Sequence, residues 1–179
     1  MAKHHIQRVL FTAEQIRHRV EALARELIAH YPPGDVIAVA VLKGSFVFVA
    51  DLARLLAAHD LHLVIDFITL DSYGAGTESS GRVTVRQDIS VPVHGRRVLL
   101  IDDILDTGLS LQTARDLLLT RGAAEVRACV LLDKPARRRV PITADYIGFV
   151  VDDVFVVGYG LDFESRYRHL PYLAALSLD

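Results

Sequence analysis

The sequence predicts an α/β domain with a mostly parallel central sheet flanked by helices. Three short, largely apolar segments, 36–42, 98–101 and 126–132, are separated by stretches in which apolar residues recur at helical spacing. Such continuous apolar segments are typical of strands that are buried on both faces, as in a parallel sheet covered by helices. Because strands and helices alternate, we expect right-handed crossovers, with these three strands at the centre of the sheet.

The N-terminal part of the chain predicts two helices around the first of these strands. Residues 12–15, Thr-Ala-Glu-Gln, resemble a capping box, and the helix that follows should stop at Pro32-Pro33-Gly34. Strand 36–42 then turns at Lys43-Gly44-Ser45 into a second helix, which is marked by apolar residues between 46 and 56.

The middle of the chain predicts a strand, a polar loop and a returning strand. Strand 61–70 leads into a loop rich in glycine, serine and threonine at 71–81, and segment 82–87 returns from it. We expect this unit to form a flexible hairpin flap. Towards the C-terminus, segments 146–151 and 154–159 predict two shorter strands.

The run VLLIDDILDTGLSL, residues 98–111, is the most informative segment of the chain. Four apolar residues lead into the adjacent acids Asp102 and Asp103, and a third acid, Asp106, follows. In open α/β sheets, ligands bind outside the carboxyl ends of the strands. Paired carboxylates accept hydrogen bonds from sugar hydroxyls and are ligands for hard cations such as Mg²⁺.

The loop after these acids predicts a phosphate site. Thr107, Gly108 and Ser110 are small or carry hydroxyl groups, and a helix begins beside them. Unpaired N–H groups at the start of a helix, together with its dipole, favour an anion. The alternative interpretation is that Asp106 or Thr107 only caps the helix. The full order of strand, acid pair, acid, loop and helix favours a site for ribose 5-phosphate instead.

The same run resembles the phosphoribosyl-diphosphate signature of the type I phosphoribosyltransferases. Four further motifs match the hypoxanthine-guanine (6-oxopurine) branch of that family in order and spacing, so the resemblance covers about residues 8–172. It implies a single domain over residues 1–179, in which the N-terminal helix and the C-terminal segment form a small hood over the active site. The four motifs are Leu42-Lys43-Gly44-Ser45, Asp71-Ser72-Tyr73-Gly74, Leu132-Asp133-Lys134-Pro135 and Phe155-Val156-Val157-Gly158-Tyr159-Gly160-Leu161-Asp162.

The resemblance implies a pentosyl transferase of purine salvage. Such an enzyme transfers 5-phosphoribosyl from phosphoribosyl diphosphate to hypoxanthine or guanine, giving IMP or GMP and pyrophosphate. Mg²⁺ is the implied cofactor, with Asp102, Asp103 and Asp162 as its candidate ligands. Asp106 is the candidate general base at purine N7, because a carboxylate accepts a proton as positive charge builds on the base.

The resemblance also assigns residues to the substrates. Lys134 would donate a hydrogen bond to the 6-oxo group and so disfavour adenine. Phe155 would stack on the base, although a strand phenylalanine can equally belong to the core. The candidate substrate-binding residues are Lys43, Gly44, Ser72, Tyr73, Asp102, Asp103, Ile104, Asp106, Thr107, Gly108, Leu109, Ser110, Lys134, Phe155, Val156, Asp162 and Arg168.

Several of these residues carry more specific expectations from the family. The Lys43–Gly44 backbone and Arg168 would contact pyrophosphate, and the peptide bond before Lys43 can be cis. Ser72 and Tyr73 would close over the reacting centre and exclude water. Asp102 departs from the family, which commonly has glutamate at this position, so its reach is one methylene shorter.

Composition limits the other classes of function. A net charge of -2 argues against nucleic acid as the main partner. A hydrophobic content of 51% predicts a large core and an apolar subunit interface, hence a homodimer or homotetramer. The single cysteine, Cys129, lies in an apolar segment and should be buried. Without an apolar signal-peptide region or a membrane-length apolar run, we expect a cytoplasmic protein with no membrane partner.

Alternatives to this function stay open from the sequence. A regulatory RNA-binding protein on the same fold predicts a large basic face, and the Arg137-Arg138-Arg139 run is either part of it or a solvated turn. A transferase for another base is a second alternative; Lys134 and Phe155 argue against adenine and uracil, whereas xanthine stays open. A receiver-like phosphoacceptor domain should carry its acid pair near the chain start, not past residue 100.

Overall fold

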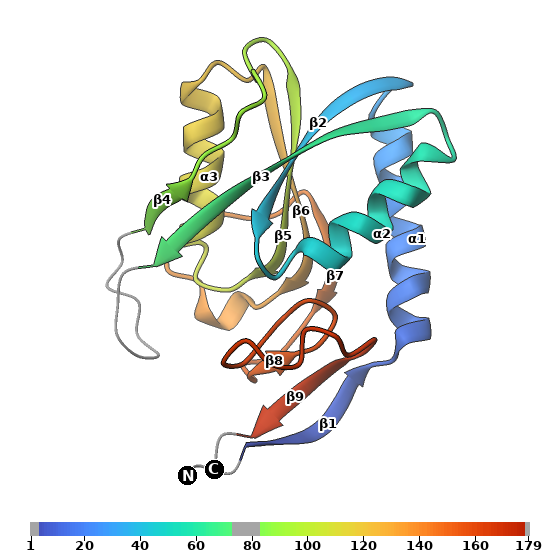
Figure 1. Ribbon diagram of the computed structural model, residues 1–179, viewed down its shortest axis with the longest axis vertical. Coiled ribbons are helices and arrows are strands. Elements are labelled where there is room, and N and C mark those ends of the chain that lie inside the picture. Colours follow the sequence, from blue (N-terminus) through green and yellow to red (C-terminus); the bar gives the residue numbers. More distant parts are fainter. Residues whose placement is uncertain (1–3, 73–82, 178–179) are drawn as a thin grey trace.

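The computed structural model describes residues 4–72 and 83–177, which form two sheets and the helices around them (Figure 1). In chain order the elements are β1 (His5–Phe11), α1 (Ala13–His30), β2 (Gly34–Leu42), α2 (Phe46–Ala57), β3 (Leu61–Ser72), β4 (Val83–Gln87), β5 (Arg97–Leu105), α3 (Leu109–Thr120), β6 (Glu125–Asp133), the 3₁₀ turn η1 (Pro135–Arg137), β7 (Tyr146–Val150), β8 (Val156–Val157) and β9 (Leu173–Ser177).

The larger sheet has six strands in the order β4-β3-β2-β5-β6-β7. All neighbouring strands are parallel except β3 and β4, which are antiparallel. The three apolar segments predicted to lie at the centre became β2, β5 and β6, so the α/β class and the central strands are confirmed. Since the strands are parallel, the loops that follow β2, β3, β5 and β6 all emerge at one edge of the sheet, the carboxyl edge.

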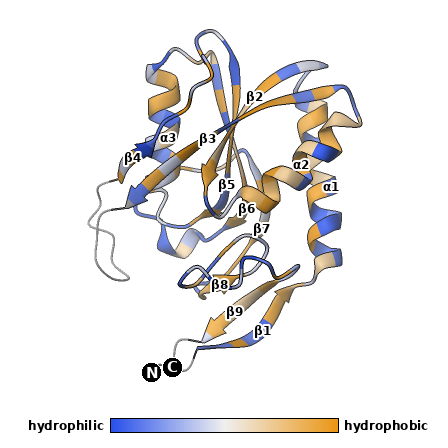
Figure 2. Cartoon of the chain, in the orientation of Figure 1, coloured by the Kyte–Doolittle hydropathy of each residue, from blue (hydrophilic) through white to orange (hydrophobic). Residues whose placement is uncertain are grey.

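Helices cover both faces of this sheet and create two cores. Ala38 and Ala40 of β2 pack in the cluster that contains α1 and α2, whereas Ile37 and Val39 pack in the cluster that contains α3. Figure 2 shows the central strands as mainly hydrophobic, while α1 carries hydrophilic residues along its length. Burial on both faces explains why these strands are continuous apolar segments in the sequence.

Helix α1 begins and ends where its local sequence predicts. The Thr12 hydroxyl accepts a hydrogen bond from the Gln15 amide at 3.2 Å, and the Thr12 amide donates to the Gln15 side chain at 2.8 Å. This reciprocal capping box satisfies two amides that helix geometry leaves unpaired, and such caps contribute about 1 kcal/mol. The helix ends at His30, just before the two prolines.

The smaller sheet, of order β1-β9-β8, brings both ends of the chain together (Figure 1). It differs from the hood that the sequence predicts, because strand β1 rather than helix α1 joins the C-terminal segment. Helix α1 instead packs on α2 and β7, since its apolar face is buried in the core of the larger sheet. The predicted strand 154–159 is shortened to β8 because Gly158 and Gly160 turn the chain with positive φ values of 100° and 103°.

The flap prediction falls largely on residues that the structure does not describe. Strands β3 and β4 form the predicted antiparallel pair, in which Ser72 lies opposite Val83. The loop between them, residues 73–82, lies outside the described residues, and so does Tyr73. Of the flap candidates, only the backbone position of Ser72 at the end of β3 is therefore defined.

Two further expectations concern burial and membranes. Cys129 is a buried free thiol in the core, as predicted, and burial raises its pKa. In the described part of the chain, none of the helices combines the length and apolar character needed to cross a bilayer.

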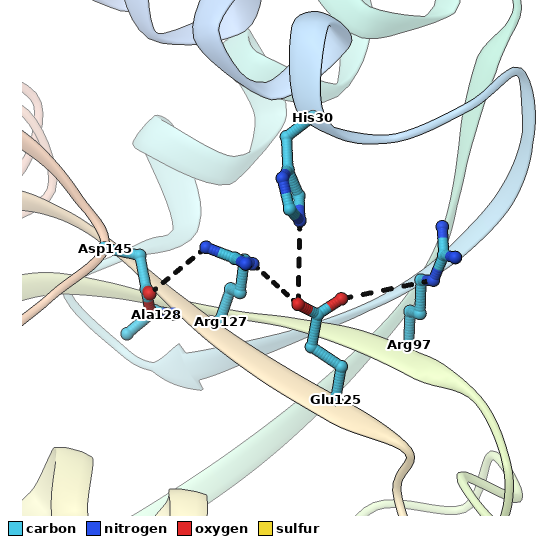
Figure 3. Close-up of polar contacts among 6 residues, drawn as sticks. All are labelled: His30, Arg97, Glu125, Arg127, Ala128 and Asp145. Atoms are coloured by element: carbon cyan, nitrogen blue, oxygen red, sulfur yellow. Dashed lines mark hydrogen bonds and ion pairs between the residues drawn. The ribbon is translucent and has the colours of Figure 1, made fainter.

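At the opposite, amino edge of the larger sheet, a polar network surrounds Glu125, the first residue of β6 (Figure 3). Its carboxylate lies 2.8 Å from the Arg127 guanidinium, 3.6 Å from the His30 ring and 4.0 Å from Arg97. Arg127 also lies 3.5 Å from Asp145. The hydrogen bond from Arg127 is the main reason that the pKa of Glu125 is lowered. The network joins the end of α1 to β5 and β6.

Candidate active site

The carboxyl ends of β2, β3 and β5 surround a polar cavity of about 450 Å³. This is the end of the sheet at which the sequence places the acid run, and the cavity collects most of the predicted site residues. A wall from the segment between β8 and β9 completes it. The predicted residues that line the cavity are Lys43, Gly44, Asp102, Asp103, Ile104, Asp106, Thr107, Gly108, Ser110, Asp162 and Arg168.

Besides Ser72 and Tyr73, whose side chains lie outside the described part of the chain, four predicted residues do not line this cavity: Leu109, Lys134, Phe155 and Val156. The side chain of Lys134 is buried, and its backbone amide donates to the Leu105 carbonyl at 3.0 Å, so Lys134 lies beside the end of β5. Val156 is buried in the small sheet, where it pairs with Ala175.

Phe155 is half-exposed rather than part of the core. Its ring packs edge-to-face against Phe163, with centroids 5.5 Å apart, and 37% of the residue is exposed. An aromatic ring left open on one side is suited to stacking on a planar base. This exposure favours the binding interpretation of Phe155 over the core alternative.

At the end of β5, Asp102 is buried and Asp103 is half-buried. Asp102 is 5% exposed, and its Oδ1 accepts a hydrogen bond from the Asp103 amide at 2.9 Å. Neither carboxylate takes part in an ion pair within the described residues. Burial raises the pKa of Asp102 well above its usual range, and the adjacent Asp103 charge raises it further. Burial also raises the pKa of Asp103, which the positive charge of Arg168 partly offsets.

The loop after β2 lies directly against this acid pair. The Leu42–Lys43 peptide is cis, as the family resemblance implied. A Cβ atom at Gly44 would overlap the Asp103 carboxylate, so only glycine permits this approach of loop and acid. The Ser45 hydroxyl donates to the Val41 carbonyl at 2.5 Å and holds the turn into α2.

The loop after β5 presents the start of α3 to the cavity. Gly108 is the N-cap of α3, with a φ of +88° that glycine adopts without strain, and it has no side chain to bond the first helix amides. Gly108 is therefore the N-cap residue, and the Thr107 hydroxyl accepts a hydrogen bond from the Leu109 amide at 3.4 Å. Thr107 and Ser110 add hydroxyl groups to the same wall. The amides at the start of the helix, the hydroxyls and the helix dipole together suit a phosphate.

Asp106 lies between the acid pair and this loop. Its Oδ1 atom is buried and has no hydrogen-bond partner among the described residues. The Nε atom of Arg137 lies 3.6 Å from it, beyond hydrogen-bond distance. A carboxylate oxygen with a free lone pair at the edge of a cavity is suited to accept a proton.

Asp162 and Arg168 form the opposite wall of the cavity. The Arg168 guanidinium lies 2.7 Å from the Asp162 carboxylate and donates to the Gly160 carbonyl at 2.6 Å. The other Asp162 oxygen accepts from the Ser165 amide at 2.7 Å. Asp162 is therefore paired with a cation within the protein, whereas Asp102 and Asp103 form no ion pair among the described residues.

The three candidate metal ligands do not gather into one cluster. Among the described residues, no group of three or more histidine, cysteine or acidic side chains is placed to hold a metal ion. Mg²⁺ is commonly bound by one or two carboxylates together with substrate phosphates. The oxygen-only pair Asp102 and Asp103 fits such shared binding, and Asp162, which lines the same cavity, stays a predicted ligand of Mg²⁺ bound to the diphosphate.

The sequence left open whether the arginine run 137–139 is a solvated turn or part of a basic face. Arg138 is largely buried and forms an ion pair with Asp133, and Arg137 lies 3.6 Å from Asp106 and 3.7 Å from Asp153. The solvated-turn interpretation is therefore wrong for Arg138, whereas Arg137 is partly exposed and lies near two carboxylates. The signal was the position of the run directly after β6, whose carboxyl end lies beside that of β5.

A larger cavity of about 830 Å³ lies between α1, α2 and segment 168–171. It is lined mainly by apolar side chains such as Ile16, Val20 and Val47, and it shares Arg168 with the polar cavity. It contains neither the acid pair nor the loop before α3. The smaller, polar cavity is therefore the candidate active site.

Comparison with known proteins agrees with this geometry. The sequence profile described as "phosphoribosyl transferase domain" matches residues 10–164. The chain belongs to the phosphoribosyltransferase family. The acid pair, the loop before α3 and the cavity between them all lie inside the matched residues, so the family resemblance of the motifs is confirmed.

Relatives of this phosphoribosyltransferase are known from several bacteria. The hypoxanthine-guanine phosphoribosyltransferase of Bacillus subtilis is 44% identical over 176 residues, 98% of this chain and 96% of that protein. The structure of a hypoxanthine phosphoribosyltransferase from Staphylococcus aureus has a TM-score of 0.89 and 40% identity, covering 96% of this chain and 92% of that one. The bifunctional protein TilS/HprT of Listeria innocua is 46% identical over 171 residues, but the match spans only 26% of its length.

Proposed function

We propose that this phosphoribosyltransferase transfers 5-phosphoribosyl from phosphoribosyl diphosphate to N9 of hypoxanthine or guanine, forming IMP or GMP and pyrophosphate. The observation that carries the proposal is the convergence of a buried acid pair, a phosphate-sized loop and a glycine loop on one polar cavity. The names of the relatives support the choice of 6-oxopurines as acceptors. The product nucleotides make the reaction a step of purine salvage.

In this proposal each wall of the cavity binds one part of the ribosyl donor. The start of α3, with Thr107, Gly108, Leu109 and Ser110, binds the 5-phosphate through amides and hydroxyls. Asp102 and Asp103 accept hydrogen bonds from the ribose hydroxyls. On the other side, the backbone at 43–44 and the guanidinium of Arg168 bind pyrophosphate.

Lys134, Phe155 and Val156 bind the purine beside this cavity. Lys134 donates to O6, Phe155 stacks on the ring, and Val156 contacts the base through its backbone. Ile104 lines the cavity near the ribose, and Asp162 completes the wall with Arg168. Ser72 and Tyr73 belong to the closing flap, for which Tyr73 lies outside the described residues.

The reaction then needs one proton acceptor. The bond from C1′ to the pyrophosphate oxygen breaks as N9 of the purine forms its bond to C1′, and pyrophosphate leaves with the bonding electrons. The purine proton at N7 passes to the free Oδ1 of Asp106. Asp102 and Asp103 would also hold Mg²⁺, which offsets negative charge on the leaving group when it is bound.

We also propose an oligomeric state and a cellular compartment for this protein. Apolar side chains at the surface, among them Phe46 at 44% and Val150 at 63% exposure, support a homodimer or homotetramer. A buried free thiol at Cys129 is compatible with a reducing cytoplasm.

One assay tests the proposed function. The purified protein, phosphoribosyl diphosphate and Mg²⁺ are incubated with each base in turn, and nucleotide formation is followed by ultraviolet absorbance. We expect product with hypoxanthine and guanine and none with adenine or uracil, while a xanthine arm defines the range of 6-oxopurines. A variant with Asp102→Asn and Asp103→Asn serves as the inactive control. Absence of nucleotide from every base, or retention of RNA at moderate salt instead, would contradict the proposal.

A further inference from the structure

Segment 134–139 is fixed across Asp106, the candidate base, by backbone hydrogen bonds. The Lys134 amide donates to the Leu105 carbonyl at 3.0 Å, and the Arg139 amide donates to the Thr107 carbonyl at 2.9 Å. These two carbonyls belong to the residues directly before and after Asp106. The backbone of the segment is therefore held in register with Asp106 on both sides.

The side chains of this segment continue into a row of alternating charges. The Arg137 Nε lies 3.6 Å from Asp106 Oδ1 and 3.7 Å from Asp153 Oδ1. The same Asp153 oxygen lies 3.9 Å from Lys134 Nζ. Negative and positive side chains thus alternate along the row, which runs from Asp106 through Arg137 and Asp153 to Lys134.

Exposure differs along this row. The Lys134 side chain is only 5% exposed, whereas those of Asp106, Arg137 and Asp153 are 33%, 37% and 57% exposed. Asp106 and Lys134, at the two ends of the row, are the residues that the proposed function assigns to the purine. Arg137 and Asp153, in the middle of the row, are partly exposed, and ion pairs at such positions contribute little to stability by themselves. A purely stabilising role therefore gives a weak account of the row.

The Arg137 contact also leaves Asp106 free to react. A separation of 3.6 Å is attractive between opposite charges but too long for a hydrogen bond. Asp106 Oδ1 therefore keeps its lone pair while the arginine restricts where the carboxylate lies. A general base needs this arrangement, because its position is restricted while its lone pair stays available for the proton.

We propose that Arg137 and Asp153 are positioning residues that hold Asp106 and Lys134 side by side for one edge of a 6-oxopurine. The inference rests on the proposed function, in which Asp106 faces N7 and Lys134 faces O6. These two purine atoms are neighbours on the same edge of the base. An acceptor and a donor set at a fixed spacing match that edge of the N7-protonated base, and adenine, with an amino group at position 6, does not.

The test is a double-mutant cycle between Arg137 and Asp106. Arg137→Met keeps the alkyl stem and removes the charge, and Arg137→Lys restores a cation. We expect Arg137→Met to lower kcat for IMP formation about tenfold with little change in the KM for phosphoribosyl diphosphate, because a small misplacement of the base slows proton transfer. Arg137→Lys should recover part of the loss. In the Asp106→Asn background, Arg137→Met should have almost no further effect, because it acts through Asp106.

The control is Arg121→Met, which removes a similarly exposed arginine that pairs with Asp88 away from the cavity. It should leave kcat unchanged, and thermal denaturation of all variants excludes loss of folding as the cause. An Arg137→Met variant with unaltered kcat, or one with the same loss in both backgrounds, would overturn the inference. A wild-type protein that forms no nucleotide contradicts the proposed function instead, so the two failures are distinguishable.

Asp153 is tested against its neighbour in the sequence. Asp153→Asn should raise the KM for hypoxanthine about threefold through Lys134, as expected for loss of a solvent-exposed ion pair. Asp152→Asn is the matched control, because Asp152 forms no ion pair within residues 4–72 and 83–177. Equal effects of the two substitutions, or none from Asp153→Asn, would remove Asp153 from the row.

Discussion

The two edges of the larger sheet place carboxylates in opposite surroundings. At the amino edge, Glu125 lies among Arg127, His30 and Arg97, and its pKa is lowered (Figure 3). At the carboxyl edge, Asp102 and Asp103 are buried without an ion pair in the described chain, and the pKa of both is raised. The ion pairs around Glu125 stabilise the folded protein. The burial of Asp102 and Asp103 lowers the stability of the free protein and points to a role in binding.

The contrast separates structural from functional acids by their partners rather than by residue type. A buried charge without a counter-charge is unfavourable in the free protein. Hydroxyl donors of a ribose, or a cation that arrives with the substrate, would satisfy Asp102 and Asp103 only during binding. Perturbed carboxylates in a cavity are characteristic of functional sites.

The largest expected difference between the edges is in turnover. Asp106→Asn at the carboxyl edge should lower kcat about a hundredfold with little change in substrate affinity, because general-base help is lost. Steady-state kinetics with hypoxanthine measures this. Glu125→Gln, the matched change at the amino edge, should leave kcat unaltered. Equal turnover in Asp106→Asn and the wild type would remove Asp106 from its role as base.

Substitution of one cation at each edge should distinguish the two edges by its effect on selectivity for the purine base. Lys134→Ala should reduce the preference for hypoxanthine over adenine about tenfold, since the hydrogen bond to O6 disappears. The ratio of kcat/KM for the two bases is the measurement. Arg97→Ala at the amino edge is the control and should keep the wild-type ratio. Our assignment of Lys134 fails if its substitution leaves base selectivity where it was.

Removing one charge from the acid pair should increase the free energy of unfolding. Because burial raises the folded-state pKa of Asp102, its ionised form is unfavourable at neutral and higher pH. Asp102→Asn should therefore raise the free energy of unfolding by about 1 kcal/mol at pH 7.5. The gain should vanish as the pH falls below about 3, where the wild-type residue is protonated in both states. Urea denaturation across this range checks it, and a less stable variant at pH 7.5 would contradict it.

Glu125 should show the opposite sign and the smallest effect. Its folded-state pKa is lowered, so its stabilisation is present above the unfolded value and is lost as the pH falls through the folded value. Glu125→Gln should lower the free energy of unfolding by about 0.5 kcal/mol at pH 7, as for partly exposed ion pairs. Below about pH 4 the variant and the wild type should converge. A variant as stable as the wild type at pH 7 would show that the network contributes nothing.

Much of the fold follows from local patterns in the sequence. The apolar runs of β2, β5 and β6 and the capping box of α1 are encoded within a few residues each, and the structure confirms them. Strands β1 and β9 were not predicted, because each is short and becomes a strand only by pairing with the other end of the chain.

The candidate site also contains parts that the sequence predicts and parts that it does not. The walls that follow β2 and β5 were predictable, because each motif is contiguous and the carboxyl ends of parallel strands meet. Arg137 and Asp153 were missed as partners of Asp106 and Lys134, since their contacts join loops that are separate in the sequence. The metal assignment of Asp102, Asp103 and Asp162 stays a prediction, and the structure adds that Asp162 is bonded to Arg168 and to the Ser165 amide.

The pairing of β1 with β9 also has a practical consequence for engineering. His5 lies opposite Ser177, so the two ends of the described chain are adjacent in the smaller sheet, whereas the acid pair belongs to β5 of the larger sheet (Figure 1). A few glycine residues would bridge them, and a backbone-cyclised or circularly permuted version should retain its catalytic cavity.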